Sequence, residues 1–325
     1  MSPRPRREIA AARARLYSLV RAELSGRGYA EVETPCLLPA PGMEPQITAF
    51  ESKWRPEMPG PAARRLFLQT SPEYAMKRLL ADGFGHVFQI CKAFRNGEAA
   101  PRHNPEFTLL EFYRSPGGAE EIRRDLEALV HAAAAAFGAP ALAEPVQTLS
   151  VREAFRSRLG IDLAACRDGA ALAAAAAARG LPAASADRFD DVFFALFLSG
   201  IEPTLTSPVF LTEWPASMAA LARILPGDPP VADRFELYAA GLELANGFGE
   251  LNDAAEQRRR LLAEQDERRA AGRPAYPLDE RFLEAVGRMP PSAGVAIGLD
   301  RLLMLLLGAE RIDEVLLFPA SAEWR

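Results

Sequence analysis

The segment AFRNGEAAPRHNPEFTLLEFYR, residues 93–114, holds the densest group of side chains that could do chemistry. Its two ends alternate as strands do, and a polar loop from Asn96 to Asn104 joins them. A period of two puts Phe107, Glu111 and Tyr113 on one strand face. A ring, a carboxylate and a phenol on one face could stack a planar base and hold a cation. An amphipathic hairpin with a solvated polar face fits the segment equally well.

Cationic side chains flank this segment and recur near the C-terminus. Arg95 closes the first strand, and its planar guanidinium suits a phosphate or a carboxylate. The chain has three histidines, and His103 lies in the polar loop. Arg301 follows Gly298 at the start of an apolar helix, where the macrodipole favours anions. An anionic ligand would resolve that tension, and so would a salt bridge to Asp300.

A second polar group lies in GLELANGFGELND, residues 241–253. Glu243, Asn246 and Glu250 interrupt an otherwise apolar strand, where acidic residues are costly unless they are paired or bound to a metal. An edge strand with exposed glutamates is the alternative. The sequence lacks the P-loop, the dinucleotide-binding glycine motif and the HExxH and CxxC metal motifs. A nucleotide site would therefore use side chains.

The bulk composition restricts the class of protein. The chain has 325 residues, 49% of them hydrophobic, and a formal net charge of -5. An acidic chain is a poor candidate for gripping long nucleic acids, which need a basic face. Three widely spaced cysteines fit a reducing compartment, and neither a signal peptide nor a membrane span is indicated. We expect a soluble, cytoplasmic protein.

The elements that must position these residues follow from periodicity and from helix-terminating residues. Strands occur in pairs and helices cluster between them, which is typical of an α+β antiparallel sheet. Alanine-rich helices fill about 119–200, with a capping box at Ser150 and Glu153. The other predicted elements are helices at 7–24, 70–83, 253–272 and 300–308, a loop at 58–65, and strands at 29–35, 86–95, 106–114, 209–216, 234–248 and 293–299.

Four stretches, taken in chain order, resemble the class II aminoacyl-tRNA synthetases, and specifically their lysyl branch. RGYAEVETPCL resembles motif 1, the dimer-forming helix and strand, and FRNGEAAPRHNPEFTLLEFY resembles motif 2. GVAIGLDRLLML resembles motif 3, and FELYAAGLELANGFGELND is similar to the segment that lines the lysyl amino-acid pocket. The resemblance implies a class II catalytic core, an antiparallel β-sheet flanked by helices. It implies a single domain over 1–325, with a helical insertion at about 119–205.

Three departures from the lysyl-tRNA synthetases narrow this resemblance. About thirty residues precede EVETPC, too few for a β-barrel anticodon-binding domain. Ala296 replaces a glycine of motif 3, which adds a methyl group beside the pocket. In motif 2, Gly97 stands where a glutamate is usual, and Glu98 follows it. A freestanding core of this kind resembles the elongation factor P lysine ligase family, the lysyl-tRNA synthetase paralogues, over residues 7–318.

That family resemblance implies an ATP-dependent ligase. It would activate (R)-β-lysine or lysine as an aminoacyl-adenylate and transfer it to a lysine side chain of elongation factor P. A minimal lysyl-tRNA synthetase and a non-catalytic lysine sensor are the alternatives. The expected cofactors are ATP and Mg²⁺. The expected partners are elongation factor P and a second copy of the chain through motif 1, without tRNA or a membrane.

The resemblance also implies roles for individual residues. Arg95 and Arg301 would be catalytic, Glu243 chiefly a nucleotide and metal residue, and Glu250 a substrate residue and second metal ligand. The residues implied for ATP are Arg95, Asn96, Glu98, His103, Asn104, Phe107, Glu243, Leu244, Gly298 and Arg301. The residues implied for the amino acid are Ser71, Pro72, Glu73, Glu111, Tyr113, Asn246, Glu250 and Ala296.

Overall fold

The computed structural model describes residues 4–57, 62–182 and 188–324, which form two compact units. The first unit contains Met1–Gly118 and Leu251–Arg325, and the second contains Ala119–Glu250. The predicted helical insertion at about 119–205 falls inside the second unit, which also contains strands. The single-domain assignment stays a prediction.

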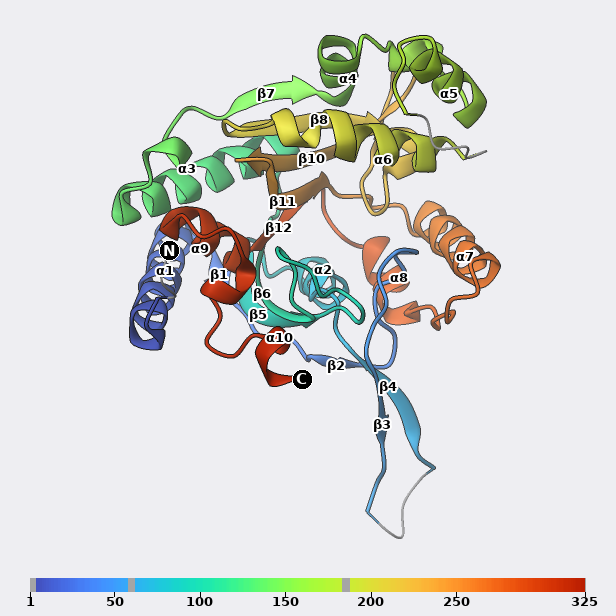
Figure 1. The fold of residues 1–325 in the computed structure, drawn as a ribbon. Coiled ribbons are helices and arrows are strands. Elements are labelled where there is room, and N and C mark those ends of the chain that lie inside the picture. Colours follow the sequence, from blue (N-terminus) through green and yellow to red (C-terminus); the bar gives the residue numbers. More distant parts are fainter. Residues whose placement is uncertain (1–3, 58–61, 183–187, 325) are drawn as a thin grey trace. The chain divides into compact units, whose positions relative to one another are not determined.

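The first unit is built on a sheet whose strands run in the order β1-β5-β6-β12. Two neighbouring pairs, β5 with β6 and β6 with β12, are antiparallel, whereas β1 pairs with β5 in parallel. A smaller sheet, β2-β4-β3, includes the β3–β4 hairpin that projects from this unit (Figure 1). The strands are β1 (Ala30–Glu31), β2 (Leu37–Leu38), β3 (Glu51–Trp54), β4 (Arg64–Leu68), β5 (Val87–Phe94), β6 (Glu106–Arg114) and β12 (Ala293–Gly298).

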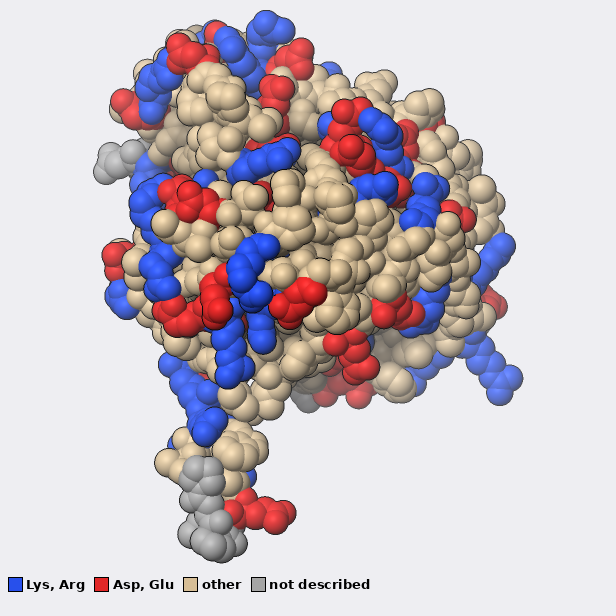
Figure 2. Space-filling model, turned by 180° about the vertical axis from the view of Figure 1, so that it is seen from behind, with Lys and Arg blue, Asp and Glu red and all other residues tan. Residues whose placement is uncertain are grey.

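Several helices of the first unit bury apolar side chains, whereas no residue of the short helix at Ala320–Glu323 is buried. In α1, buried positions recur at helical spacing, from Ile9 through Leu16 and Val20 to Leu24. Basic and acidic side chains are interspersed on the face that Figure 2 shows. The helices are α1 (Arg6–Gly26), α2 (Glu73–Ala81), α7 (Ala254–Ala270), α8 (Glu280–Val286), α9 (Leu299–Leu307) and α10 (Ala320–Glu323).

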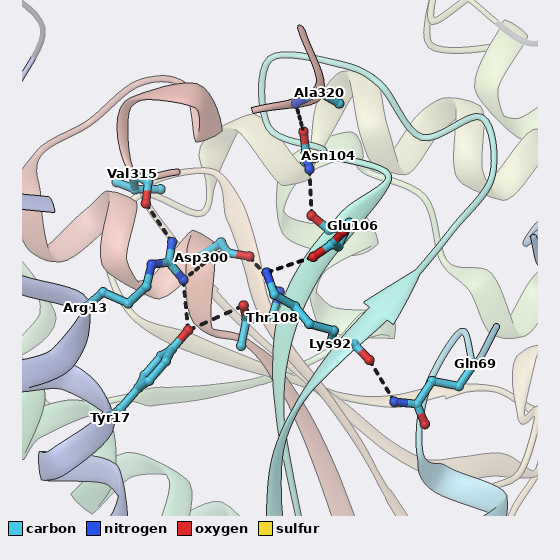
Figure 3. Close-up of polar contacts among 10 residues, drawn as sticks. All are labelled: Arg13, Tyr17, Gln69, Lys92, Asn104, Glu106, Thr108, Asp300, Val315 and Ala320. Carbon is cyan, nitrogen blue, oxygen red and sulfur yellow. Dashed lines mark hydrogen bonds and ion pairs between the residues drawn. The ribbon is translucent and has the colours of Figure 1, made fainter. Parts of the chain in front are cut away.

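A buried polar network ties α1, β6 and α9 together, as Figure 3 shows. Asp300 is 1% exposed and accepts from Arg13 at 2.6 Å and from the Thr108 backbone N–H at 2.7 Å. Arg13 also donates to the Val315 carbonyl at 2.6 Å and to the Tyr17 hydroxyl at 2.9 Å. The carboxylate is therefore a structural residue that fixes the start of α9 against β6.

We expect an Asp300→Ala variant to lose about 3–5 kcal/mol of unfolding free energy, because it leaves the Arg13 charge without its buried partner. Urea unfolding followed by circular dichroism measures the change. Asp82→Ala is the control, since that carboxylate is 57% exposed and lies 3.7 Å from Arg288. Equal stability of the two variants would show that the Arg13–Asp300 pair contributes nothing.

The second unit combines helices with a mostly antiparallel sheet in the order β11-β10-β8-β7, and β9 pairs with β10. Its core contains stacked aromatic rings, including Phe155 and Phe193 with centroids 4.7 Å apart. The capping box predicted at Ser150 and Glu153 is confirmed. The elements are α3 (Ala119–Phe137), β7 (Gln147–Ser150), α4 (Val151–Leu159), α5 (Gly169–Ala177), α6 (Phe189–Gly200), β8 (Val209–Pro215), β9 (Ile224–Leu225), β10 (Val231–Ala239) and β11 (Leu242–Gly249).

The α+β class is confirmed, and four local predictions are corrected. The single strand predicted at 234–248 is a hairpin of two strands, because Ala240 and Gly241 turn the chain with positive φ. The strand predicted at 29–35 shortens to Ala30–Glu31 and pairs in parallel, although the Val32 N–H still donates to the Phe88 carbonyl at 2.8 Å. The loop predicted at 58–65 ends earlier, because Arg64 and Arg65 pair with β3; residues 58–61 lie outside the described ranges. The helix predicted at 70–83 begins at Glu73, after Pro72. Within the described ranges, no helix has the length and apolarity to cross a membrane.

Candidate active site

Arg95 leaves the end of β5 with its guanidinium beside an aromatic ring. Its backbone N–H donates to the Pro105 carbonyl at 2.9 Å, which closes the loop between β5 and β6. The guanidinium carbon lies 5.0 Å from the Phe107 ring centroid, and one nitrogen lies 3.7 Å from Glu98. Arg95 Nε is shielded from water and has no hydrogen-bond acceptor among the described residues. Such a donor fits an anionic ligand, since an unmet buried donor is costly.

His103 and Arg301 meet although the sequence separates them widely. Arg301 Nη2 lies 2.7 Å from His103 Nε2. A guanidinium only donates, so the imidazole nitrogen accepts and is unprotonated there. Asp300 bonds to Arg13 and Thr108, so the predicted alternative of an Asp300–Arg301 pair is wrong. The structure thus brings two predicted phosphate residues together, with Gly298 against the Arg301 side chain.

The loop between these cations is held by backbone and amide contacts. The Asn96 N–H donates to the Thr48 carbonyl at 2.7 Å. Asn104, which is 7% exposed, donates to the Glu106 carbonyl at 2.6 Å and accepts from the Ala320 N–H at 3.0 Å (Figure 3). Both the nitrogen and the oxygen of the Asn104 amide therefore form hydrogen bonds to the backbone. Gly97 has φ +92°, a conformation that a glutamate rarely adopts.

A buried acidic group lies at the other end of β6. Glu111 is 1% exposed and accepts from Ser71 Oγ at 2.7 Å and from the Tyr113 hydroxyl at 2.6 Å. Ser71 Oγ also accepts from the Glu73 N–H at 3.0 Å, so it links the start of α2 to β6. Glu73 forms an ion pair of 2.5 Å with the buried Lys77. The alternative of a solvated polar face on this strand is wrong.

Ala296 on β12 is the direct cross-strand partner of Glu111 on β6. Directly opposed residues in an antiparallel pair point to the same face of the sheet. Ala296 and Glu111 therefore share one face of the sheet, and the role of Ala296 in shaping the amino-acid pocket stays a prediction. Pro72, the remaining predicted substrate residue here, immediately precedes α2.

The environment of Glu111 changes its acidity. Burial, followed by the charge of Glu73, raises the pKa of Glu111 to about 8, against an ordinary value near 4.5. The hydrogen bonds from Tyr113 and Ser71 and the charge of Lys77 oppose this rise. An ammonium group placed beside the carboxylate would also favour its ionised form. The pocket therefore suits a cationic ligand.

We expect the pH dependence of stability to reflect this raised pKa. Between about 4.5 and 8 the folded protein holds the Glu111 proton and the unfolded chain releases it, so unfolding free energy falls as pH rises. Unfolding free energies at pH 5 and at pH 8.5 measure the decline. Glu111→Gln should show a smaller decline, because it has no proton to lose. An unchanged decline in that variant would mean that Glu111 titrates normally.

The second unit holds four predicted site residues, on and beside β11. Glu243, Leu244 and Asn246 lie on this strand, and Glu250, which is 2% exposed, follows it in a bridge with Ala222. Burial of Glu250 contradicts the alternative of an edge strand with exposed glutamates at this position. Their roles in binding ATP and the amino acid stay predictions.

Sequence reasoning missed a further buried carboxylate in this unit. Glu236 on β10 is 4% exposed and accepts from the Tyr238 hydroxyl at 2.7 Å and from Arg234 at 2.5 Å. Burial is the main cause that raises its pKa to about 7, and the charge of Glu243 adds to the rise. The signal was present in the sequence, since FELY repeats the Glu-x-Tyr spacing of LEFY.

Comparison with known proteins shows the family to which the chain belongs. The family model described as "tRNA synthetases class II (D, K and N)" matches residues 3–322. An elongation factor P--(R)-beta-lysine ligase from Edwardsiella ictaluri is 42% identical over 314 residues, which cover 95% of this chain and 94% of that protein. The chain belongs to the class II tRNA synthetases, in the elongation factor P--(R)-beta-lysine ligase family. Family members from Salmonella arizonae and Erwinia tasmaniensis are 40% and 41% identical, with the same coverage of both chains.

Family membership confirms the class II catalytic core. Its acidic residues can be compared with the ligands that Mg²⁺ usually has in nucleotide enzymes. The described residues contain no group of three or more histidine, cysteine, aspartate or glutamate side chains placed to hold a metal ion. Mg²⁺ in nucleotide enzymes is usually bound by one or two carboxylates together with substrate phosphates. Glu243 and Glu250 fit that donor set in chemical type, without a cage made by protein alone.

Proposed function

We propose that this ligase uses ATP to activate (R)-β-lysine or lysine as an aminoacyl-adenylate and transfers it to a lysine side chain of elongation factor P. The observation that carries the proposal is the presence, within one unit, of a buried carboxylate at Glu111 and guanidinium groups at Arg95 and Arg301. The carboxylate suits an ammonium group, and the guanidinium groups suit phosphates. The ligase name of the relatives supports the same reaction.

In the first step, a carboxylate oxygen of the amino acid attacks the α-phosphorus of ATP. A new O–P bond forms, and the bond to the pyrophosphate leaving group breaks. Negative charge develops on the phosphate oxygens during this attack, and fixed cations stabilise it. Because the protein forms no covalent bond in this step, it acts by positioning the reactants and by electrostatic stabilisation. Arg95 would hold the α-phosphate, while His103 and Arg301 would meet the outer phosphates. Phe107 would stack on the adenine, and Arg301 would cover the other face of the base. Asn96, Glu98, Asn104 and Gly298 would shape the surrounding loop and helix start.

Magnesium would neutralise the phosphates of ATP when bound, with Glu243 and Glu250 as its protein ligands. Glu250 would also contact an ammonium group of the substrate, Leu244 would contact ATP, and Asn246 would contact the amino acid. Glu73 would belong to the amino-acid pocket through Ser71, whose hydroxyl bonds to both Glu73 and Glu111.

In the second step, the neutral amine of a lysine side chain on the acceptor protein attacks the acyl carbon. A C–N bond forms, and AMP leaves with the electrons of the acyl–oxygen bond. Desolvation of the incoming lysine would lower its pKa and supply the neutral amine.

We also infer a homodimer through α1 and β1, which sedimentation velocity would test.

ATP–pyrophosphate exchange tests the first step. We expect exchange with (R)-β-lysine or lysine, and much less with 2-aminohexanoic acid, which lacks the distal amine. The measurement is incorporation of labelled pyrophosphate into ATP, with each amino acid at several concentrations. Equal exchange with the monoamine would contradict the acidic pocket as the selecting feature.

A further inference from the structure

The loop between β2 and β3 places a carboxylate in a small pocket of the first unit. Glu44 lines this pocket with Gly42, Thr70, Ser71 and Glu73. Glu44 Oε2 is shielded from water and has no hydrogen-bond partner among the described residues. A buried carboxylate oxygen without a partner is costly, so its position points to a cation that the protein itself does not supply.

The loop around Glu44 is held through backbone carbonyls, and Oε2 of its carboxylate is not used in these bonds. Arg268 on α7 is fully buried and donates to the Glu44 and Ile47 carbonyls at 2.7 Å each. These bonds fix the loop and do not involve the Glu44 side chain. A Cβ at Gly42 would lie 2.3 Å from Glu44 Oε2, so the carboxylate occupies space that only glycine leaves open.

The charges in this region match a ligand with two ammonium groups. Glu44, Glu73 and Glu111 are acidic, and Lys77 forms an ion pair with Glu73. In the described part of the chain, Glu44 and Glu111 have no ion-pair partner, which leaves two carboxylates for two ligand cations. Burial and the charge of Glu73 raise the pKa of Glu44, and the charge of Arg95 lowers it. The loop that carries Glu44 also contacts the chain next to Arg95, since the Thr48 carbonyl accepts from the Asn96 N–H at 2.7 Å.

We propose that Glu44 is a specificity-determining residue that receives the amino group nearest the reacting carboxylate of a diamino acid, while Glu111 and Tyr113 face the distal one. The assignment of ends follows from Arg95, because the α-phosphate is the atom group that the substrate carboxylate attacks. This inference rests on the proposed function, whose substrate is a diamino acid. It adds a residue outside the four motif segments of the sequence.

The test pairs an enzyme variant with a substrate variant. The probes are (R)-β-lysine and 6-aminohexanoic acid, which lacks the amino group nearest the carboxylate. Glu44→Gln should raise the calorimetric Kd and the exchange KM for (R)-β-lysine by about 10- to 100-fold. The same two constants for 6-aminohexanoic acid should change by no more than about twofold. Glu44→Asp should recover part of the loss. Glu264→Gln is the matched control, since Glu264 interacts electrostatically with Glu44 but does not line the pocket.

The outcomes separate this inference from the proposed function. An equal loss on both probes, or an equal loss in Glu264→Gln, would overturn the role of Glu44. Normal exchange by the wild type with an unaffected Glu44→Gln variant would overturn the inference and leave the function standing. If Glu44→Gln lost calorimetric binding of (R)-β-lysine alone and the wild type showed no exchange, the role of Glu44 would stand and the proposed function would be overturned. Absence of any diamino acid binding by the wild type would overturn both.

Discussion

An Arg95→Ala enzyme is expected to lose ATP–pyrophosphate exchange by at least about 10²- to 10³-fold, the cost of removing one preorganised donor from a developing oxyanion. The unmet Nε of Arg95 is buried and lies beside Phe107, so an anionic ligand would complete its hydrogen bonding. The fold should persist, because the backbone bond from Arg95 to Pro105 does not use the side chain. Exchange rates and far-UV circular dichroism measure both effects.

Two further variants make this result specific. Arg95→Lys keeps the charge but loses the planar fork, so only partial recovery is expected. Arg288→Ala removes an exposed arginine that lies 3.7 Å from Asp82, and it should leave exchange unchanged. Near-normal exchange in a folded Arg95→Ala enzyme would refute the assignment of Arg95 to the phosphate.

A Glu111→Gln enzyme is expected to lose about 100-fold in kcat/KM for the diamino acid, because a buried ammonium would lack its charged partner. The KM for ATP should change little, since Glu111 bonds to Ser71 and Tyr113 and not to the arginines. Exchange assays with either substrate varied separate the two effects.

The matched control for Glu111 lies on the same strand. Glu106→Gln alters an exposed carboxylate that lies 3.4 Å from Lys92, and it should leave both parameters unchanged. An equal loss in Glu111→Gln for 2-aminohexanoic acid, which lacks the distal amine, would show that Glu111 acts through the fold.

The hairpin of β5 and β6 illustrates what periodicity can predict. Alternation along residues 106–114 predicted that Glu111 and Tyr113 share a face, and their hydrogen bond of 2.6 Å confirms it. Local pattern does not report burial on both faces, which is why a solvated face remained an alternative. The capping box at Ser150 and Glu153 was similarly local and predictable, whereas the helix predicted from residue 70 begins at Glu73.

Contacts between distant parts of the chain were not predictable from local pattern. Asp300 pairs with Arg13, 287 positions away, instead of its neighbour Arg301. Glu44 lies in an irregular segment without periodicity, and Arg268 fixes that segment from 224 positions away. The length of β1 likewise depends on its parallel partner β5. Such placements depend on how the whole unit packs. Long-range packing leaves no local periodic pattern in the sequence from which it could be predicted.

Intact mass spectrometry tests most directly whether the acceptor is a protein side chain. The enzyme is incubated with ATP, Mg²⁺ and (R)-β-lysine or lysine, and elongation factor P and bulk tRNA are offered together. The proposal predicts that elongation factor P gains the mass of one lysyl group and that tRNA stays uncharged. Charged tRNA beside unmodified elongation factor P would contradict it and identify a minimal lysyl-tRNA synthetase.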